Sequence, residues 1–389
     1  MERRPTIGIF KQILAAAVFF GLAGTLYWFV NHGDQPTPSP APPGQSEWSA
    51  ALQSLSAEGF ERPSPYWTLS LPADHAVHPL AQTESWQLSV HLRTAQSAPL
   101  GLQFSLMRLG IESPKAPPPD SIWEVRELYR GHVTLLAAGA DKGVGEEKLA
   151  RALPEITGYD TSGGSLRIDN WVMRFGDDAT APNLELFATV SHDMEVTLSM
   201  RPEKDVMAFA PEGAEAPFVG YAFPRLVVEG SIRYAGGEER VSGTAWLDHA
   251  WGDLPIPGAG PVSWDRVQLH LDDGTDVSIL RARRTDGRGA ATINGLAISA
   301  EGTISTFDET DVRMTSTRLW RHPQTGTEYP VAWQIEGPGI DVTLEAVQDA
   351  QTHDFTVPFW AGLIAVKGQW NARDVSGLGS MQLTGYANE

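Results

Sequence analysis

Hydrophobic and polar residues alternate in short runs through most of the chain, from about residue 48 to the C-terminus. Alternation with a period of two is typical of β-strands that bury one face. Clusters of Gly, Asp, Pro and Ser separate the runs, which favours a sandwich or barrel over a parallel sheet with helices. The predicted strands cover residues 86–92, 102–108, 132–136, 166–175, 184–190, 194–200, 226–234, 239–245, 267–271, 276–281, 292–298, 302–307, 331–335, 342–347, 359–367 and 379–384.

Two turn sequences predict hairpins between neighbouring runs. They are Ala-Gly-Gly at residues 235–237 and Asp-Asp-Gly at residues 272–274. Gly in such turns allows the backbone angles that tight hairpins need. One stretch departs from the strand pattern, because residues 145–153 are rich in Glu, Lys and Arg. We expect a short helix there.

The N-terminus carries a membrane signal. Residues 13–30 form an uncharged, mostly apolar run, which as a helix would be about 27 Å long and would span the bilayer core. Arg3, Arg4 and Lys11 precede it, so the N-terminus is expected in the cytoplasm. We therefore predict an uncleaved, single-pass anchor over residues 1–33 in the cytoplasmic (inner) membrane. A cleaved signal peptide is the alternative, and both place the rest of the chain outside that membrane, in the periplasm.

Composition suggests where the chain divides. Residues 34–47 are rich in Pro and should form an extended, semi-rigid linker. Residues 211–217 are rich in Pro, Gly, Ala and Glu, which is typical of a boundary between domains. The prediction is one β-domain over residues 48–216 and a second over residues 217–389.

Charge and cysteine content exclude several functions. The chain has 29 Lys and Arg against 48 Asp and Glu, a net charge of −19. Nucleic acid is therefore not expected as a partner, because phosphate binding needs a basic face. The chain has no Cys, which excludes disulfides, thiolate metal sites and a cysteine nucleophile. No Gly-rich phosphate loop follows a strand, and we expect no cofactor.

A weak internal repeat suggests that the two β-domains are related. The tripeptide Asp-His-Ala occurs at residues 74–76 and again at residues 248–250, and each copy precedes a pair of strand-like runs. The repeat predicts that each domain opens with an Asp-His loop and a hairpin. Chance similarity between two hairpins is the alternative.

Candidate chemistry is densest between residues 243 and 281. Trp246, Trp251 and Trp264 lie near Asp248 and His249. Large amphipathic rings beside ionisable groups suit a pocket for an apolar ligand with a few polar contacts. The alternative is that the Trp residues are core and that the Asp and His are turn and cap residues.

A metal site is not expected. His75 and His78 have a spacing that Zn²⁺ tolerates, but the sequence places no third ligand beside them. A serine hydrolase is likewise not favoured, because the chain has no Gly-x-Ser-x-Gly motif.

Several motifs in a fixed order carry a family resemblance. The chain resembles the family that joins carotenoid 1,2-hydratases with AttH-type proteins, which are also labelled predicted secreted hydrolases. The resemblance covers roughly residues 65–386, and it implies two lipocalin-like β-barrel domains around a cavity for a long apolar molecule. The matching motifs are Asp74-His75, His78-Pro79, Glu84-Ser85-Trp86, Trp123-Glu124, Leu128 to His132, Asp169-Asn170-Trp171, Phe223 to Leu226, Gly243 to Gly252, Trp264-Asp265, Tyr329 to Trp333 and Leu383 to Tyr386.

The resemblance implies roles for individual residues. In the hydratase branch, water adds across an isoprenoid double bond, which needs a proton donor and a pocket that tolerates a carbocation. Asp248 matches the position of the donor, and Trp246 matches an aromatic neighbour whose ring stabilises the cation. We expect both in the wall of an apolar hollow inside the second barrel. The residues expected to bind the ligand are His249, Trp251, Trp264, Asp74, His75, Glu84 and Trp86.

Three departures from the family weaken the transfer of catalysis. Ala250, Ala361 and Gln382 stand where relatives carry acidic or amide side chains. The sequence therefore favours a membrane-anchored, extracytoplasmic binding protein that holds a lipid, isoprenoid or polyene for lipid handling or export. An ABC-type export system is a candidate partner. The alternative is a hydro-lyase that hydrates an isoprenoid or carotenoid double bond, with Asp248 as proton donor.

Overall fold

The computed structural model describes residues 55–386 apart from 65, 97, 119–120, 122–123, 138–142, 179–181, 210–216, 255–261 and 285–287. The predicted membrane helix at residues 13–30 and the Pro-rich linker at residues 34–47 lie outside the described residues. Among those that are described, no helix is both long and apolar enough to cross a membrane.

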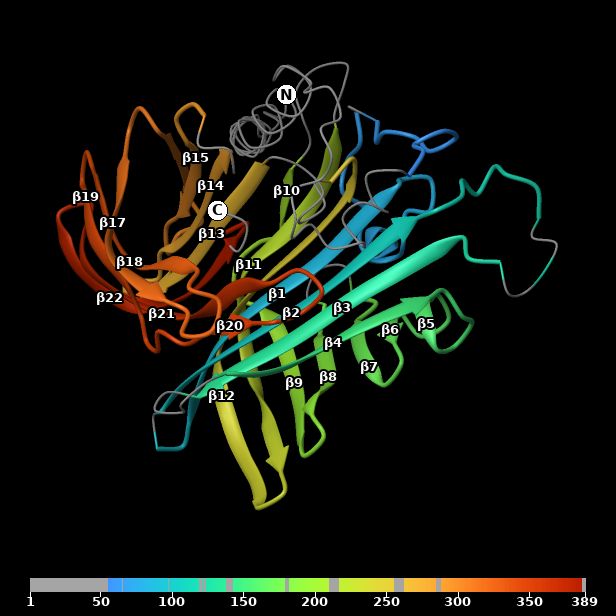
Figure 1. Ribbon diagram of the computed structural model, residues 1–389, viewed down its shortest axis with the longest axis horizontal. Coiled ribbons are helices and arrows are strands. Elements are labelled where there is room, and N and C mark those ends of the chain that lie inside the picture. Colours follow the sequence, from blue (N-terminus) through green and yellow to red (C-terminus); the bar gives the residue numbers. More distant parts are fainter. Residues whose placement is uncertain are drawn as a thin grey trace, which may run out of the picture.

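The described part of the chain is all-β, as predicted, and it forms two curled antiparallel sheets (Figure 1). A single 3₁₀ turn, η1 (Ala73–His75), precedes the first strand. The first sheet contains β1 (Thr83–Thr94), β2 (Pro99–Gly110), β3 (Glu127–Ala137), β4 (Val144–Arg151), β5 (Thr157–Asp160), β6 (Ser165–Ile168), β7 (Trp171–Phe175), β8 (Leu184–Ser191), β9 (Met194–Pro202), β10 (Met207–Phe209), β11 (Phe218–Tyr234) and β12 (Gly237–Gly252). The second contains β13 (Val262–Leu271), β14 (Asp276–Arg284), β15 (Thr292–Ile298), β16 (Ile304–Asp308), β17 (Arg313–Arg321), β18 (Glu328–Gly337), β19 (Ile340–Ala346), β20 (Thr352–His353), β21 (Phe359–Trp370) and β22 (Arg373–Thr384).

The two sheets share one strand order, as expected of two related halves. The first runs β4-β3-β2-β1-β12-β11-β9-β8-β7, and the second runs β16-β15-β14-β13-β22-β21-β19-β18-β17. In both, one short strand pairs off this path, β10 on β11 and β20 on β21. Strands β6 and β5 extend the first sheet beyond β7. Both predicted hairpins are present, as β11–β12 and β13–β14.

One part of the predicted repeat is wrong. The second Asp-His-Ala, at residues 248–250, does not open the second domain but lies in β12, the last strand of the first sheet. The boundary between the two sheets also differs from the predicted domain boundary. Strands β11 and β12 follow the predicted division at 216/217, yet they pair with β9 and β1, so the chain changes sheet only between Gly252 and Val262. Turn-rich composition marks a connection, but it does not tell whether the next strand returns to the same sheet.

The predicted helix at residues 145–153 is also wrong, because β4 occupies this stretch. Strand β4 pairs with β3 along its length. Its charged side chains find partners on the sheet: Glu147 lies 2.7 Å from Arg130, and Lys148 lies 2.7 Å from Asp169. Helix propensity is a weak preference, and strand pairing with cross-strand ion pairs overrides it here.

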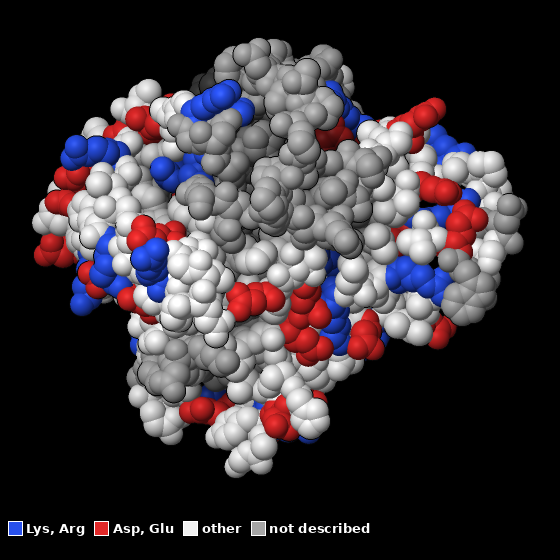
Figure 2. All heavy atoms as spheres, viewed as in Figure 1, with Lys and Arg blue, Asp and Glu red and all other residues white. Residues whose placement is uncertain are grey.

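Each sheet buries its own core, and a third contact region joins the two. Trp86 and Leu247 belong to the first core, and Val267 and Trp360 to the second. Between the sheets lies a smaller apolar cluster made by Met207, Phe209, Ala222 and Trp246 of the first sheet with Leu296 and Ile298 of the second. On the molecular face shown in Figure 2, Lys and Arg side chains are interspersed with Asp and Glu.

A buried carboxylate ties the two sheets together beside this cluster. Asp276 of β14 lies 2.7 Å from Arg225 of β11 and 2.7 Å from Lys204, and its side chain has no exposed surface. Burial raises the pKa of Asp276, and the two cations oppose that effect. The pair of cations supplies the compensation that a buried carboxylate needs.

Candidate functional site

Strand β12 divides the predicted site between two faces of the first sheet. Successive side chains of a strand point to opposite faces. Trp246 and Asp248 therefore face the second sheet, where Trp246 joins the cluster between the sheets. Leu247 and Trp251 belong to the core inside the first sheet, and His249 between them shares their face. The adjacent residues Asp248 and His249 cannot serve one pocket.

Asp248 lines a cavity of about 200 Å³ between the two sheets. The prediction that Asp248 lies in the wall of a hollow inside the second barrel is therefore wrong. Asp248 belongs to the first sheet, and the cavity that it lines is between the two sheets. A dry cavity of about 150 Å³ accommodates benzene, so this one has the volume for a ring or a short branched chain. Its apolar lining is Met107, Phe209, Phe218, Ala250, Leu254, Trp264 and Leu280, and its polar lining is Ser85, Gln87, Ser105, Arg130, His132, Asp248, Arg266, Ser278 and Gln382.

Two hydrogen bonds and an ion pair hold the carboxylate of Asp248. Trp246 Nε1 donates to Oδ1 at 2.7 Å, and Gln268 Nε2 donates to Oδ2 at 3.1 Å. Arg266 forms an ion pair with the same carboxylate. Donors and a nearby cation stabilise the ionised form of a carboxyl group over its neutral form. The arrangement makes Asp248 one half of a fixed ion pair in the cavity wall.

Equivalent strands of the two sheets build the centre of the cavity. Gln87 and Asp248 are cross-strand partners on β1 and β12. Arg266 and Gln382 are cross-strand partners on β13 and β22, the equivalent strands of the second sheet. Two of the three positions that depart from the family pattern, Ala250 and Gln382, line this cavity. The third, Ala361, lines a much smaller space nearby.

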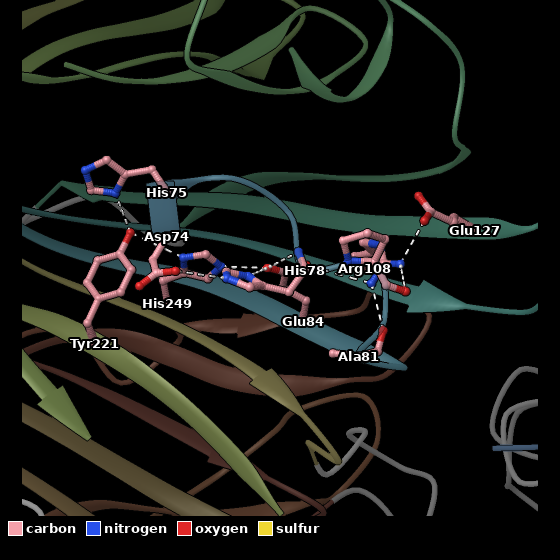
Figure 3. Close-up of polar contacts among 10 residues, drawn as sticks. Asp74, His75, His78, Ala81, Glu84, Arg108, Glu127, Tyr221 and His249 are labelled. Atoms are coloured by element: carbon pink, nitrogen blue, oxygen red, sulfur yellow. Dashed lines mark hydrogen bonds and ion pairs between the residues drawn. The ribbon is translucent and has the colours of Figure 1, made fainter. Parts of the chain in front are cut away.

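A second group of polar side chains lies inside the first sheet, and we call it the His–Glu cluster (Figure 3). Glu84 Oε1 is its centre, because it accepts hydrogen bonds from His78 Nδ1 at 2.8 Å and from His249 Nε2 at 2.9 Å. The other oxygen, Oε2, accepts the backbone N–H of His78 at 2.9 Å. Members of the cluster are Asp74, His75, His78, Glu84, Tyr221 and His249.

Outer partners fix each imidazole of the cluster. His249 Nδ1 lies 3.3 Å from the Tyr221 hydroxyl, which also contacts His75 Nδ1 at 2.6 Å. His78 Nε2 lies 3.5 Å from Asp74 Oδ1. The rings are held on their faces as well, with Trp86 stacked on His249 at 4.5 Å and Trp251 stacked on His78 at 3.5 Å between centroids.

The cluster has a definite charge state near neutral pH. Burial opposes ionisation of Glu84, but hydrogen bonds from His249 and His78 outweigh it and lower its pKa to about 2. Burial lowers the pKa of His249, and it lowers that of His75 to about 3. Burial also acts on His78, but hydrogen bonds to Asp74 and Glu84 outweigh it and raise its pKa. Glu84 is therefore anionic, and the surroundings favour a proton on His78 over one on His249.

An arginine completes the charge balance around Glu84. Arg108 Nη1 lies 3.7 Å from Glu84 Oε2, and Arg108 Nη2 donates to Glu127 at 2.7 Å. Arg108 Nη1 also donates to the backbone oxygen of Ala81, and Nη2 to that of Pro79. The cluster therefore ends in a buried ion pair on β1 and β2.

The predicted site residues thus fall into two separate groups. Trp246, Asp248 and Trp264 lie on the side between the sheets. The others predicted to bind ligand meet inside the first sheet, where Trp86 and Trp251 pack against imidazoles: Asp74, His75, Glu84, Trp86, His249 and Trp251. Sequence reasoning missed Arg266, Gln268, Arg108 and Tyr221. Alternation along β13 could have placed Arg266 and Gln268 on one face, but no sequence signal joined that face to Asp248.

Similarity to known proteins identifies the family of this chain. The family model described as AttH-like matches residues 62–386. The chain belongs to the AttH-like family. No curated protein matches it.

Two crystal structures are similar to this AttH-like chain. A putative AttH from Nitrosomonas europaea has a TM-score of 0.70 at 24% identity, covering 84% of this chain and 100% of its own. Kievitone hydratase from Nectria haematococca has a TM-score of 0.57 at 16% identity, covering 84% of this chain and 98% of its own. At these identities the similarity shows a shared fold.

Proposed function

We propose that this AttH-like protein binds a small apolar molecule, or the apolar end of a larger one, in the cavity between its two sheets. The observation that carries the proposal is the cavity of about 200 Å³, with Phe209, Phe218, Trp264 and Leu280 in its wall. Ligand pockets are mostly apolar, with a few polar groups that orient the ligand. The ion pair of Asp248 with Arg266 is such a group.

Cavity size limits the ligand. Pockets that enclose a drug-sized molecule measure about 300–1,000 Å³, so this cavity does not enclose a complete carotenoid. A prenyl unit, a ring or the end of an acyl chain fits the space. The polar part of a longer ligand would then lie outside the cavity.

The proposal includes a location. Residues 13–30 would anchor the protein in the cytoplasmic membrane, and the sheets would lie on the periplasmic side. There the protein would take a lipid or isoprenoid from the bilayer and pass it to an export system. Alkaline extraction of membranes tests the anchor, since an integral protein stays with the bilayer and a peripheral one is released.

Catalysis by Asp248 stays a prediction. A kievitone hydratase shares the fold, which keeps a hydratase in view. Proton donation would require a neutral Asp248, however, and Arg266, Gln268 and Trp246 all stabilise its carboxylate. Binding therefore fits the contacts better than hydration does.

Mass spectrometry of organic extracts tests the binding proposal. Protein purified without detergent should release one chemical class of apolar compound at a reproducible ratio to protein. Native mass spectrometry of the same sample should show the corresponding mass increase. Repeated preparations that release nothing, and that take up no prenyl alcohol or fatty alcohol on incubation, would overturn the proposal.

A further inference from the structure

We propose that His78, Glu84 and His249 form a binding site for one divalent transition-metal ion, with Zn²⁺ the ion best suited to these ligands. The ligand atoms are His78 Nδ1, Glu84 Oε1 and His249 Nε2, which all lie within 4.8 Å of one another. Two imidazoles and one carboxylate are a common ligand set of Zn²⁺ sites that keep one position for water. The site lies on the opposite face of β12 from the ligand cavity and does not depend on the proposed function.

One oxygen of Glu84, Oε1, faces both imidazoles, and the backbone N–H of His78 lies 3.1 Å from it. Oε2 is held by the backbone N–H of His78 at 2.9 Å and approached by Arg108 at 3.7 Å. Both imidazole nitrogens converge on the other oxygen, Oε1, at 2.8 and 2.9 Å. With metal–ligand bonds of about 2.0–2.2 Å, tetrahedral ligands stand roughly 3.3–3.5 Å apart. Replacing the two shared protons by an ion therefore widens each of these two pairs by about half an ångström, and the two imidazole nitrogens, which lie within 4.8 Å of each other, take up the same spacing.

The surrounding groups orient the ligands as metal sites require. A ligating imidazole generally bonds through its second nitrogen to a carboxylate or other acceptor, which fixes its ring and tautomer. His78 turns its second nitrogen to Asp74, and His249 turns its second nitrogen to the Tyr221 hydroxyl. Stacking on Trp251 and Trp86 limits rotation of the same two rings. His78 is partly exposed, at 22% of its side-chain surface, which gives an ion a path from solvent.

The second sheet supplies an internal comparison. Glu84 pairs across β1 and β2 with Arg108, and Asp265 pairs across β13 and β14 with Arg281. Asp265 is hydrogen-bonded to Arg281 and to Tyr386, at 2.7 and 3.1 Å. Arg281 and Tyr386 both act as donors to the carboxylate of Asp265, whereas the imidazoles at Glu84 can each offer a lone pair. At equivalent positions, the carboxylate of the first sheet therefore contacts two imidazoles that can bind a metal ion, whereas that of the second sheet contacts an arginine.

The sequence did not predict this site because its third ligand is distant. His249 lies 165 residues from Glu84 along the chain. His78 and Glu84 are six residues apart, on the loop after η1 and on β1. Only the pairing of β12 with β1 brings His249 to them.

The experiment is metal titration of the full chain. Equilibrium dialysis against Zn²⁺ should show one tightly bound ion per chain, and Co²⁺ in its place should give the intense visible absorption of a four-coordinate ion. His78→Gln should weaken Zn²⁺ binding by at least about 100-fold, and Tyr221→Phe by about 10-fold, as loss of a ligand and of an outer partner do. His192→Gln, at an exposed histidine, is the matched control and should bind like the wild type.

Two outcomes would overturn the site. One is wild-type protein that takes up no more Zn²⁺ than His78→Gln does. The other is a Co²⁺ spectrum that stays weak, as for the hydrated ion. The spectrum needs no substitution, so a variant that fails to fold does not leave the question open.

Discussion

The two faces of β12 carry very different polar groups. Asp248 faces a cavity of about 200 Å³, whose wall combines its ion pair with Arg266, other polar side chains and apolar side chains. His249, the next residue, is buried in a cluster in which hydrogen bonds and stacked rings hold each imidazole in place. The first arrangement leaves room for an organic molecule. The second brings the ligand atoms of His78, Glu84 and His249 within 4.8 Å of one another, a spacing that suits a single ion.

This difference suggests two separate sites, one for an apolar ligand and one for a metal ion, where the sequence suggested a single pocket. Residues adjacent in the chain suggested one pocket, but a period of two sends them to opposite faces. Ligand binding is assigned to the space between the sheets, and metal binding to the interior of the first sheet. Substitutions on one face should therefore leave the other intact.

The largest effect on stability is expected from a substitution inside the first sheet. Glu84→Gln removes the anion that compensates buried Arg108 and His78, so the free energy of unfolding should fall by about 3–5 kcal/mol. Chemical denaturation measures this loss. Gln87→Ala, on the cavity face of the same strand, should cost less than about 1 kcal/mol. A loss below about 1 kcal/mol for Glu84→Gln would show that the Glu84 carboxylate is not needed to compensate the nearby cations.

The pH dependence of stability should show the buried histidines between the sheets. Burial lowers the pKa of His270 to about 3, from 6.5 in the unfolded chain, with Arg225 and Lys204 adding to the effect. Below pH 6.5 the unfolded chain binds a proton that the folded chain does not, so stability is present above that pH and is lost as the pH falls. His270 alone should remove about 2 kcal/mol between pH 6.5 and 5.

Denaturation curves at several pH values check this contribution. His270→Gln should flatten the decline between pH 6.5 and 5, whereas His192→Gln at an exposed site should leave it unchanged. An equal slope for wild type and His270→Gln would contradict a buried, neutral histidine. Ionisation of Glu84 gives a separate signature, because its pKa of about 2 confines its loss of stability to pH values below about 4.5.

Filling the cavity should affect binding and leave the metal site alone. Ala250→Phe projects a ring into the space between the sheets and should weaken binding of a prenyl or fatty alcohol at least about tenfold, or 1.4 kcal/mol. Fluorescence titration measures the affinity, with Zn²⁺ uptake as the second readout. Thr315→Phe, on an exposed position of β17, is the matched control for the added ring. Unchanged affinity in Ala250→Phe would show that the ligand binds at another site.

The smallest effect is expected at Asp248 itself. Asp248→Asn keeps the shape of the wall and removes one partner of a partly exposed ion pair, which should cost about 1 kcal/mol of stability or less. Affinity for an apolar ligand should change by less than about tenfold. Incubation with acyclic carotenoids in heavy-oxygen water distinguishes the hydratase alternative. Labelled tertiary alcohol from wild type but not from Asp248→Asn would show that Asp248 is a proton donor.

Much of the fold could be predicted from local patterns. Alternation located most strands, and turn residues located both hairpins, because burial of one face and tight turns leave local signals. The contact of Trp246 with Asp248 follows from the same periodicity, since residues two apart share a face. The separation of Asp248 from His249 was equally available from that rule.

The rest depended on contacts between distant segments. No local signal tells that β11 and β12 return to the first sheet, that β4 prefers pairing with β3 to a helix, or that Gln268 crosses to Asp248 from the second sheet. Tyr221 reaches the His–Glu cluster from β11 for the same reason. Such contacts are set by sheet topology, which propensities do not encode.

The most direct test of the account is a crystal structure of the protein soaked with bromobenzene, whose bromine is located by its anomalous scattering. The account predicts one bromine site between the two sheets, in contact with Trp264 and Phe209 and lost in Ala250→Phe. Bromine inside the first sheet beside His249, or no ordered bromine in crystals of the wild type, would contradict it.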